Sequence, residues 1–246
     1  GYVAHDYYDY KLKAINITDS SLSEASEGRT GKTLLAKMLG HVKGFTEING
    51  KDFKATDERK YQLVDMGTQI VHLNDLKTRG HNNKFDFEDV FNDITEGYMV
   101  RKMYQAPFRQ RSKFILSSNK TLNILGASQR DRIIEFEMSQ FFGEDRSPEQ
   151  YYGQWFGRDW DESEWQKFDN FMCFCASMFH RHGLQAPAPI NLGARKLLNH
   201  TSREFLDFMD DCRKMVESDG KPFDAYTLDA FKKENDFFKF EFDKKQ

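Results

Sequence analysis

A glycine-containing segment that ends in lysine and threonine carries the strongest chemical signal in this sequence. It reads Ser26-Glu27-Gly28-Arg29-Thr30-Gly31-Lys32-Thr33 and is followed by Leu34. A phosphate-binding P-loop requires Gly, four residues and then Gly-Lys-Ser/Thr, so only Ser26, in the place of the first glycine, departs from the pattern. In such a loop the backbone N–H groups face phosphate oxygens, Lys32 contacts the terminal phosphates and Thr33 offers a hydroxyl to Mg²⁺. We therefore predict that Glu27 to Leu34 bind the phosphates of ATP.

The elements around this segment are those that a P-loop needs. Residues 14–18, Ala-Ile-Asn-Ile-Thr, are typical of a short buried strand. Apolar residues recur at helical spacing after Lys32, at Leu34, Leu35, Met38 and Leu39. The alternative is a chance Gly-Lys-Thr at the start of an unrelated helix, and the preceding strand argues against it.

Polar residues follow two further apolar strands. Asp75 follows the predicted strand 69–73 after Asn74, and Asn119 follows the predicted strand 113–117 after Ser118. Parallel strands deliver such groups to one edge of an open α/β sheet. Asp75 would then hold Mg²⁺ together with Thr33, and Asn119 would orient the attacking water. An ordinary strand-end turn residue is the alternative for Asp75.

Two arginines near the strand 133–138 suit transition-state stabilisation. Arg130 and Arg132 flank Asp131, and an arginine supplied by a neighbouring subunit can stabilise charge on a transferring phosphate. We prefer Arg132, because it directly precedes the strand. Surface ion pairs with Asp131 or Glu135 are the alternative.

Basic residues are concentrated between Gly97 and Arg130, where no Asp or Glu occurs. Among them and the aromatics beside them, we predict that Arg101, Lys102, Tyr104, Arg109 and Arg111 bind single-stranded DNA. Phosphate neutralisation combined with base stacking suits such a ligand. A solvated face, or arginines that serve the nucleotide site, are the alternatives.

Composition places the chain among globular proteins. It has 246 residues, 39% hydrophobic and 15% aromatic, with 23 Phe and a formal net charge of −3. The apolar content excludes a largely disordered chain, and the small net charge excludes a uniformly basic nucleic-acid coat. No apolar run reaches the ~20 residues of a membrane span. Three cysteines are a sparse, odd set that favours a reducing compartment, so we expect a cytoplasmic protein.

The predicted elements alternate between strands and helices. Beyond those above, we expect strands at 61–64 and 133–138, helices at 86–94 and 162–182, and a hairpin at 98–108. Pro and Gly residues in 183–193 predict a boundary, with helices at 202–217 and 224–234 beyond it. The sequence thus predicts an α/β fold with a three-layer P-loop NTPase core at 1–182 and a helical or winged-helix-like extension at 183–246.

The order of these motifs resembles the superfamily 3 helicase domain of phage and plasmid primase-helicases, which is of the AAA+ kind. The resemblance covers roughly residues 1–180. The matching blocks are Gly1–His5, Ser26–Thr33 (Walker A), Ile70–Asp75 (Walker B), Phe91–Gly97 with Arg101, Lys102 and Pro107, Phe114–Asn119 (motif C) and Arg130–Phe136. Asn74 departs from the family, which usually has two acidic residues in Walker B. If the missing carboxylate activates water, hydrolysis is slow.

The resemblance implies a hexameric ring with ATP at the subunit interfaces. Hairpins in the channel would grip one DNA strand and translocate 3′ to 5′, and full-length relatives often carry a primase. It also implies a bacterial cytoplasm or a phage-infected host cell. Two other hypotheses stay open: a nucleotide-binding switch or assembly ATPase, which Asn74 motivates, and a P-loop small-molecule kinase, for which no lid signature is visible.

Overall fold

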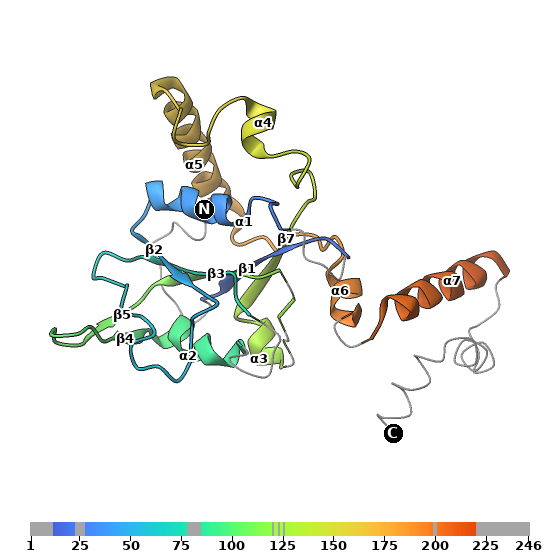
Figure 1. Ribbon diagram of the computed structural model, residues 1–246, viewed down its shortest axis with the longest axis horizontal. Helices are drawn as coiled ribbons and strands as arrows, with labels where there is room; N and C mark the ends of the chain where they lie inside the picture. Colours follow the sequence, from blue (N-terminus) through green and yellow to red (C-terminus); the bar gives the residue numbers. More distant parts are fainter. Residues whose placement is uncertain are drawn as a thin grey trace. The chain divides into compact units, whose positions relative to one another are not determined.

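A parallel β-sheet with helices on both faces forms the centre of the molecule (Figure 1). The computed structural model describes residues 12–22, 28–77, 85–119, 121–122, 124, 126–198 and 201–219. Within them, five parallel strands have the order β2-β3-β6-β1-β7. Their bounds are β1 (Ala14–Asp19), β2 (Phe45–Asn49), β3 (Ile70–Asn74), β6 (Lys113–Ser117) and β7 (Ile133–Met138). The α/β fold predicted from the sequence is confirmed.

Side chains of the central strands point alternately to the two faces of the sheet, so the core has two layers. Phe114 and Leu116 of β6 pack in the larger cluster with Val90 and Ile94. Ile115, between them, packs with Ala36 on the other face. Successive strand residues point to opposite faces, so a strand covered on both sides must be apolar throughout. This explains the short continuous apolar runs in the sequence.

Helices cover both faces of the sheet. On one side lie α1 (Lys32–Met38), its 3₁₀ continuation η1 (Leu39–His41) and α5 (Glu162–His182), and on the other lie α2 (Glu88–Glu96) and α3 (Ala127–Arg130) (Figure 1). The remaining short helix of this region is α4 (Pro148–Tyr152). The helix predicted at 162–182 is confirmed at its bounds, and the one predicted at 86–94 begins and ends two residues later.

Gly97 ends α2 and allows the chain to turn closely into a hairpin. Its φ is +83°, and a Cβ there would lie 2.6 Å from the carbonyl oxygen of Gln110. The antiparallel strands β4 (Tyr98–Val100) and β5 (Phe108–Gln110) follow. The predicted hairpin is therefore present and extends two residues further.

One predicted strand is absent from the structure, and one observed strand was not predicted. Residues 61–64 form turns, because Gln62 and Val64 donate backbone hydrogen bonds to the near neighbours Arg59 and Tyr61. Tyr61 and Val64 are nevertheless buried, three residues apart. The edge strand β2 was not predicted, because its residues Phe-Thr-Glu-Ile-Asn include only two apolar ones and most are partly exposed.

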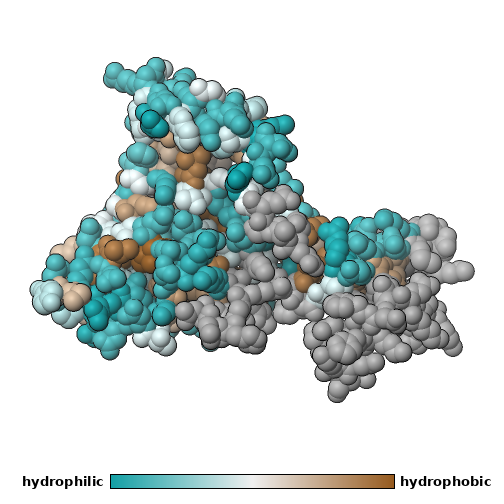
Figure 2. Space-filling view, viewed as in Figure 1, coloured by the Kyte–Doolittle hydropathy of each residue, from teal (hydrophilic) through white to brown (hydrophobic). Residues whose placement is uncertain are grey.

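Helix α5 presents large apolar side chains to solvent. Among its described residues only Phe168 is buried, whereas Phe171 and Phe174 are 57% and 59% exposed. Figure 2 shows apolar atoms among hydrophilic ones in the upper part of the molecule, where Figure 1 places α5. No helix in the described part of the chain is long and apolar enough to cross a membrane.

The chain divides into two compact units, Gly1–Leu192 and Gly193–Gln246. Near the end of the first unit, one carboxylate oxygen of Glu137 accepts hydrogen bonds from the backbone N–H groups of residues 190, 191 and 192. Helices α6 (Leu192–Leu198) and α7 (Arg203–Asp219) follow, and α7 agrees with the helix predicted at 202–217. The helix predicted at 224–234 lies outside the described residues. Domains at 1–182 and 183–246 stay a prediction.

Candidate nucleotide site

The carboxyl ends of three strands bring polar residues to one edge of the sheet. β1 ends at Asp19, β3 at Asn74 and β6 at Ser117. All three strands run in parallel, with β6 between β1 and β3. From β1 the chain crosses to the far edge strand β2, while β7 lies on the other side of β1. Open α/β sheets bind ligands at such a reversal of strand order.

Left-handed backbone conformations shape the loop before α1. Gly28, Arg29 and Gly31 have φ values of +61°, +59° and +91°. At Gly31 a Cβ would meet its nearest neighbour, Met138, only at 4.0 Å, so the backbone conformation and not crowding requires glycine here. Gly31 is also the N-cap of α1 and provides no side-chain cap to the first-turn N–H groups. Glu27, predicted to contact phosphate, lies outside the described residues, as does Ser26.

Asp19 contacts two polar side chains of the loop segment, those of Thr30 and Lys32. One carboxylate oxygen accepts a hydrogen bond from the Thr30 hydroxyl, and the other pairs with the ammonium group of Lys32. The side chains of Lys32 and Asp19 are only 11% and 6% exposed. This largely buried ion pair fixes the position of Lys32, and charge neutralisation is what makes burial of the ammonium tolerable.

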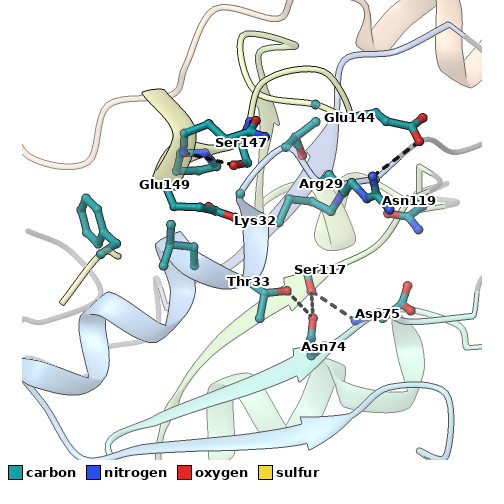
Figure 3. A pocket seen from close by; sticks show the side chains of 18 of the residues that line it. Arg29, Lys32, Thr33, Asn74, Asp75, Ser117, Asn119, Glu144, Ser147 and Glu149 are labelled. Carbon is teal, nitrogen blue, oxygen red and sulfur yellow. Dashed lines mark hydrogen bonds and ion pairs between the residues drawn. The ribbon is translucent and has the colours of Figure 1, made fainter. Parts of the chain in front are cut away.

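Asn74 connects the loop helix to the centre of the sheet (Figure 3). Its Oδ1 accepts hydrogen bonds from the hydroxyls of Thr33, at 3.1 Å, and Ser117, at 3.0 Å. Ser117 Oγ in turn accepts the backbone N–H of Asp75 at 3.2 Å. Thr33, Asn74 and Asp75 are thus tied together through one serine of the neighbouring strand.

Asp75 stands just beyond β3 in an unusual conformation for a non-glycine residue. Its φ is +60°, and its carboxylate lies 2.5 Å from Nζ of Lys51. Hydrogen bonding to this carboxylate raises the pKa of Lys51. Oxygen ligands of this kind are those that Mg²⁺ prefers, so Asp75 and Thr33 fit a magnesium ion chemically.

A buried histidine continues this polar network beneath the site. His72 is fully buried, and its Nε2 lies 3.0 Å from Ser117 Oγ. Because Ser117 has one proton and gives it to Asn74, His72 Nε2–H must be the donor. Nδ1 then bears no proton, and it lies 3.6 Å from Glu47 Oε2. Burial lowers the pKa of His72 to about 4, although Glu47 opposes the shift.

The loop and the ends of β3 and β6 border one cavity of about 760 Å³. Its volume is in the usual range for small-molecule sites. Arg29 lies across from Glu144, with 3.6 Å between the charged atoms (Figure 3). The lining residues that the sequence predicted are Gly28, Arg29, Thr30, Gly31, Lys32, Thr33, Leu34, Asp75 and Asn119. The structure therefore brings together the described residues predicted for phosphate, magnesium and water.

Arg132 does not line this cavity. It precedes β7 at the opposite edge of the sheet, where its carbonyl oxygen accepts the backbone N–H of Ala14. Its guanidinium lies 4.0 Å from the centre of the Phe91 ring. Arg130, at the end of α3, is exposed at the same edge. Five residue steps along a strand separate the two edges by roughly 16 Å, so neither arginine reaches the phosphate loop of its own chain.

The predicted DNA-binding residues fall into two groups. Arg101, Lys102 and Tyr104 lie in the turn of the β4–β5 hairpin, where Tyr104 is 99% exposed. Arg109 and Arg111 instead donate hydrogen bonds to the carbonyl oxygens of Glu96 and Thr95, at 2.8 and 3.2 Å. Guanidinium groups at a helix C-terminus satisfy carbonyls that lack partners within the helix. The second pair therefore attaches the hairpin to α2.

Sequence reasoning missed several residues of the site. Asp19, Lys51 and Glu47 contact Lys32, Asp75 and Asn74. Of these three, only Asp19 could have been identified from the sequence, because it is a polar residue directly after the predicted strand 14–18. The other two come from β2 and the turn after it, which the sequence did not reveal.

The sheet and its loop define an α/β fold consistent with a P-loop NTPase. No protein-family model matches the chain, and no curated protein matches it. Among solved structures, a crystal structure of JCV helicase with a bound acetamide compound is similar at 13% identity and a TM-score of 0.38. The similarity covers 52% of this chain and 36% of the helicase chain. The chain thus spans about a third of that protein, and a likeness of this extent establishes no family.

Proposed function

We propose that this chain is the ATP-dependent motor domain of a DNA helicase of the superfamily 3 kind. The observation that carries the proposal is the shared cavity of Lys32, Thr33, Asp75 and Asn119 at the carboxyl edge of a parallel sheet. Each residue type suits one part of phosphoryl transfer, which depends on positioning and charge stabilisation. The hairpin with an exposed basic and aromatic turn supports single-stranded DNA as the partner.

In this proposal each group of the cavity has a distinct role. Lys32 leaves Asp19 and places its charge on the terminal phosphates. Thr33 and Asp75 would hold Mg²⁺, which neutralises charge on the phosphate oxygens. The amide of Asn119 orients a water molecule toward the terminal phosphate.

An arginine from a neighbouring subunit completes the site in this proposal. Arg132 is our choice for it, and its distance from the loop of its own chain requires supply in trans. Assembly into a hexameric ring, as in the resembled family, would meet that requirement. DNA would then pass through the ring along the hairpins, and a primase domain in the full-length protein is part of the same proposal.

A nucleotide-dependent switch with little hydrolysis is the second candidate, and Asn74 favours it. The position holds an amide instead of a carboxylate, and its oxygen already accepts two hydrogen bonds from hydroxyls. An amide cannot remove a proton from water as a general base does. ATP would then bind and change the assembly, with slow turnover.

ATP hydrolysis measured with and without single-stranded DNA tests the proposal. A motor is expected to show DNA-stimulated turnover that Lys32→Ala abolishes. Lys37→Ala is the matched control, because Lys37 lies on the same helix, pairs with Glu47 at 3.4 Å and does not line the cavity. ATP binding without turnover would favour the switch, and absence of ATP binding would contradict both candidates. Oligomer mass with and without a non-hydrolysable ATP analogue tests the ring.

A further inference from the structure

We propose that the base of the bound nucleotide stacks on the indole ring of Trp155, on the wall of the cavity contributed by the chain after β7. This inference rests on the proposed function, since it concerns the same nucleotide. It adds a base-binding subsite to the phosphate site. The structure places Trp155 and Phe156 on the lining of the proposed nucleotide cavity.

Local sequence explains why this wall is well defined. Ser147 caps α4, with its hydroxyl accepting the N–H of Gln150 and its own N–H donating to the Gln150 side chain. Pro148 occupies the first turn, and Gly153, with φ of +70°, ends the helix. Ser147 and Gln150 line the cavity, as do Trp155 and Phe156 beyond the end of the helix. The wall opposite the phosphate loop is therefore a capped helix and a short turn.

Phe156 attaches this wall to the element that follows the phosphate loop. Its ring centre lies 4.4 Å from that of Trp160, which lies 5.1 Å from Trp165. Trp165 in turn lies 4.7 Å from His41, at the end of η1. This aromatic series gives Phe156 a packing role and links the wall to the helix that begins at Lys32.

Trp155 has no comparable packing partner among the described residues. Its backbone N–H donates to the carboxylate of Asp159 at 2.9 Å, which fixes the turn. The residue is 54% exposed and lines the cavity. Tryptophan is on average among the more buried residue types, so a half-exposed tryptophan on the lining of a cavity suits a flat apolar ligand group.

A heterocyclic base is the group that fits this environment. Base–aromatic stacking tolerates different bases, because every base presents a π-face. The residues of this wall that line the cavity include no lysine or arginine, and two of them, Glu144 and Glu149, are acidic. The wall therefore does not suit a further phosphate. The phosphates therefore belong at the loop and the base at Trp155, with little discrimination between ATP and GTP.

Binding measurements with ATP, GTP and inorganic tripolyphosphate, each with Mg²⁺, test this subsite. We expect Trp155→Ala to weaken ATP and GTP binding about tenfold, the size of one stacked base, and to leave tripolyphosphate binding unchanged. Trp155→Phe should retain most of the ATP affinity and remove most of the quenching of tryptophan fluorescence by ATP. Phe171→Ala, which removes an exposed aromatic ring outside the cavity, should change neither.

The outcomes separate this inference from the proposed function. Tripolyphosphate binding as tight as ATP binding in the unaltered protein would overturn the subsite and leave the phosphate site standing. ATP affinity unchanged by Trp155→Ala would overturn it equally. If the unaltered protein binds neither ATP nor tripolyphosphate, the phosphate site itself is wrong and both proposals fail. Retained tripolyphosphate binding in Trp155→Ala shows that the variant is folded.

Discussion

Asp19 holds Lys32 at the end of the first strand. The two side chains form an ion pair that is largely buried, and Thr30 donates a hydrogen bond to the other carboxylate oxygen. A lysine that binds phosphate must therefore exchange one negative partner for another. Under the proposed function, the ion pair adds a free-energy cost to nucleotide binding that the loop sequence alone does not reveal.

We predict that Asp19→Asn destabilises the protein and tightens ATP binding. Loss of a charged hydrogen-bond partner should lower the free energy of unfolding by roughly 1–3 kcal/mol, because Lys32 stays buried without its counter-charge. ATP should bind several-fold more tightly, because the phosphates no longer compete with a carboxylate. Thermal unfolding and titration with ATP measure the two effects. Asp52→Asn, at an exposed acid that accepts from Asn49, is the control; weaker ATP binding by Asp19→Asn would show that Asp19 orients Lys32 for phosphate.

Asn74→Asp is expected to raise the rate of ATP hydrolysis by at least about tenfold, since general-base catalysis is worth ~10²–10⁴. The new carboxylate would still accept from Thr33 and Ser117. It would lose the hydrogen bond from Asn74 Nδ2 to Glu47, at 3.4 Å, and face a like charge. Steady-state phosphate release measures turnover.

The double variant Asn74→Asp with Glu47→Gln separates catalysis from stability. Glu47→Gln restores a donor opposite the new carboxylate, so the double variant should unfold at a higher temperature than Asn74→Asp alone. Turnover should stay raised in both. An Asn74→Asp variant that is stable and no faster would show that position 74 does not activate water.

The glycine-containing loop before α1 and most strands of the sheet were predictable because their signals are local. The four strands predicted at 14–18, 69–73, 113–117 and 133–138 are found as β1, β3, β6 and β7. Strands β1, β3 and β6 are mostly buried and have short apolar runs, whereas the edge strand β7 alternates between apolar and polar residues over Ile134–Met138. The edge strand β2 combines apolar and polar residues and was therefore not predicted. The apolar residues at 61–64 were mistaken for a strand, although only Tyr61 and Val64 of them are buried hydrophobic residues.

Contacts between segments that are distant in the sequence could not be predicted from it. Lys51 is bound to Asp75, and Glu47 to Asn74, only because the edge strand pairs with β3. Trp155 lines the cavity because an aromatic series fixes its turn near η1. Arg109 and Arg111 were correctly placed near the hairpin, but their helix-capping contacts depend on how the hairpin packs. Residue types indicated which chemistry would suit the site, and tertiary contacts determine which residues lie there.

His72 should make stability depend on pH between about 4 and 6.5. Its pKa in the folded protein is about 4, below the ordinary 6.5, and burial is the main cause. The unfolded chain therefore binds the proton more readily, so stability is complete above pH 6.5 and falls as pH drops toward 4. Between pH 7 and pH 5 the loss is about 2 kcal/mol.

The comparison of the unaltered protein with His72→Gln isolates this contribution. Glutamine can donate to Ser117 and does not titrate, so the difference in unfolding free energy between the two proteins should shrink as pH falls from 7 to 5. Urea unfolding at the two pH values measures it. A difference that is independent of pH would contradict the neutral, buried histidine.

Arg132 should act on the nucleotide of a neighbouring subunit. Arg132→Ala is expected to lower turnover at unchanged ATP affinity. It should also reduce stability slightly, by about 0.5–1 kcal/mol, because the guanidinium packs over Phe91. Arg130→Ala, at an exposed position, serves as the comparison for the choice of arginine.

Mixing two inactive variants tests supply in trans. Lys32→Ala subunits lack a working loop and carry both arginines, whereas Arg132→Ala subunits have the loop and lack one arginine. ATP hydrolysis should reappear when they are combined. Failure to recover activity at any ratio, although mixed oligomers form, would contradict the role of Arg132.

The hairpin turn should bind single-stranded DNA through two phosphates and one base. Arg101→Ala with Lys102→Ala is expected to weaken DNA binding and to reduce the slope of log K against log salt by about 1.4, because each single-strand contact contributes about 0.7. Tyr104→Ala should weaken binding by about 1–3 kcal/mol with the slope unchanged, since stacking releases no counterions. DNA affinity measured over a series of salt concentrations distinguishes the two effects.

Arg109→Ala and Arg111→Ala are the matched controls, because they remove the same charge from the same hairpin. Their guanidinium groups bind carbonyl oxygens of α2, so their loss should lower the unfolding temperature and leave the salt slope near that of the unaltered protein. If instead this pair reduces the slope and Arg101 with Lys102 does not, the DNA strand runs along the base of the hairpin. The exposed turn would then have no part in gripping it.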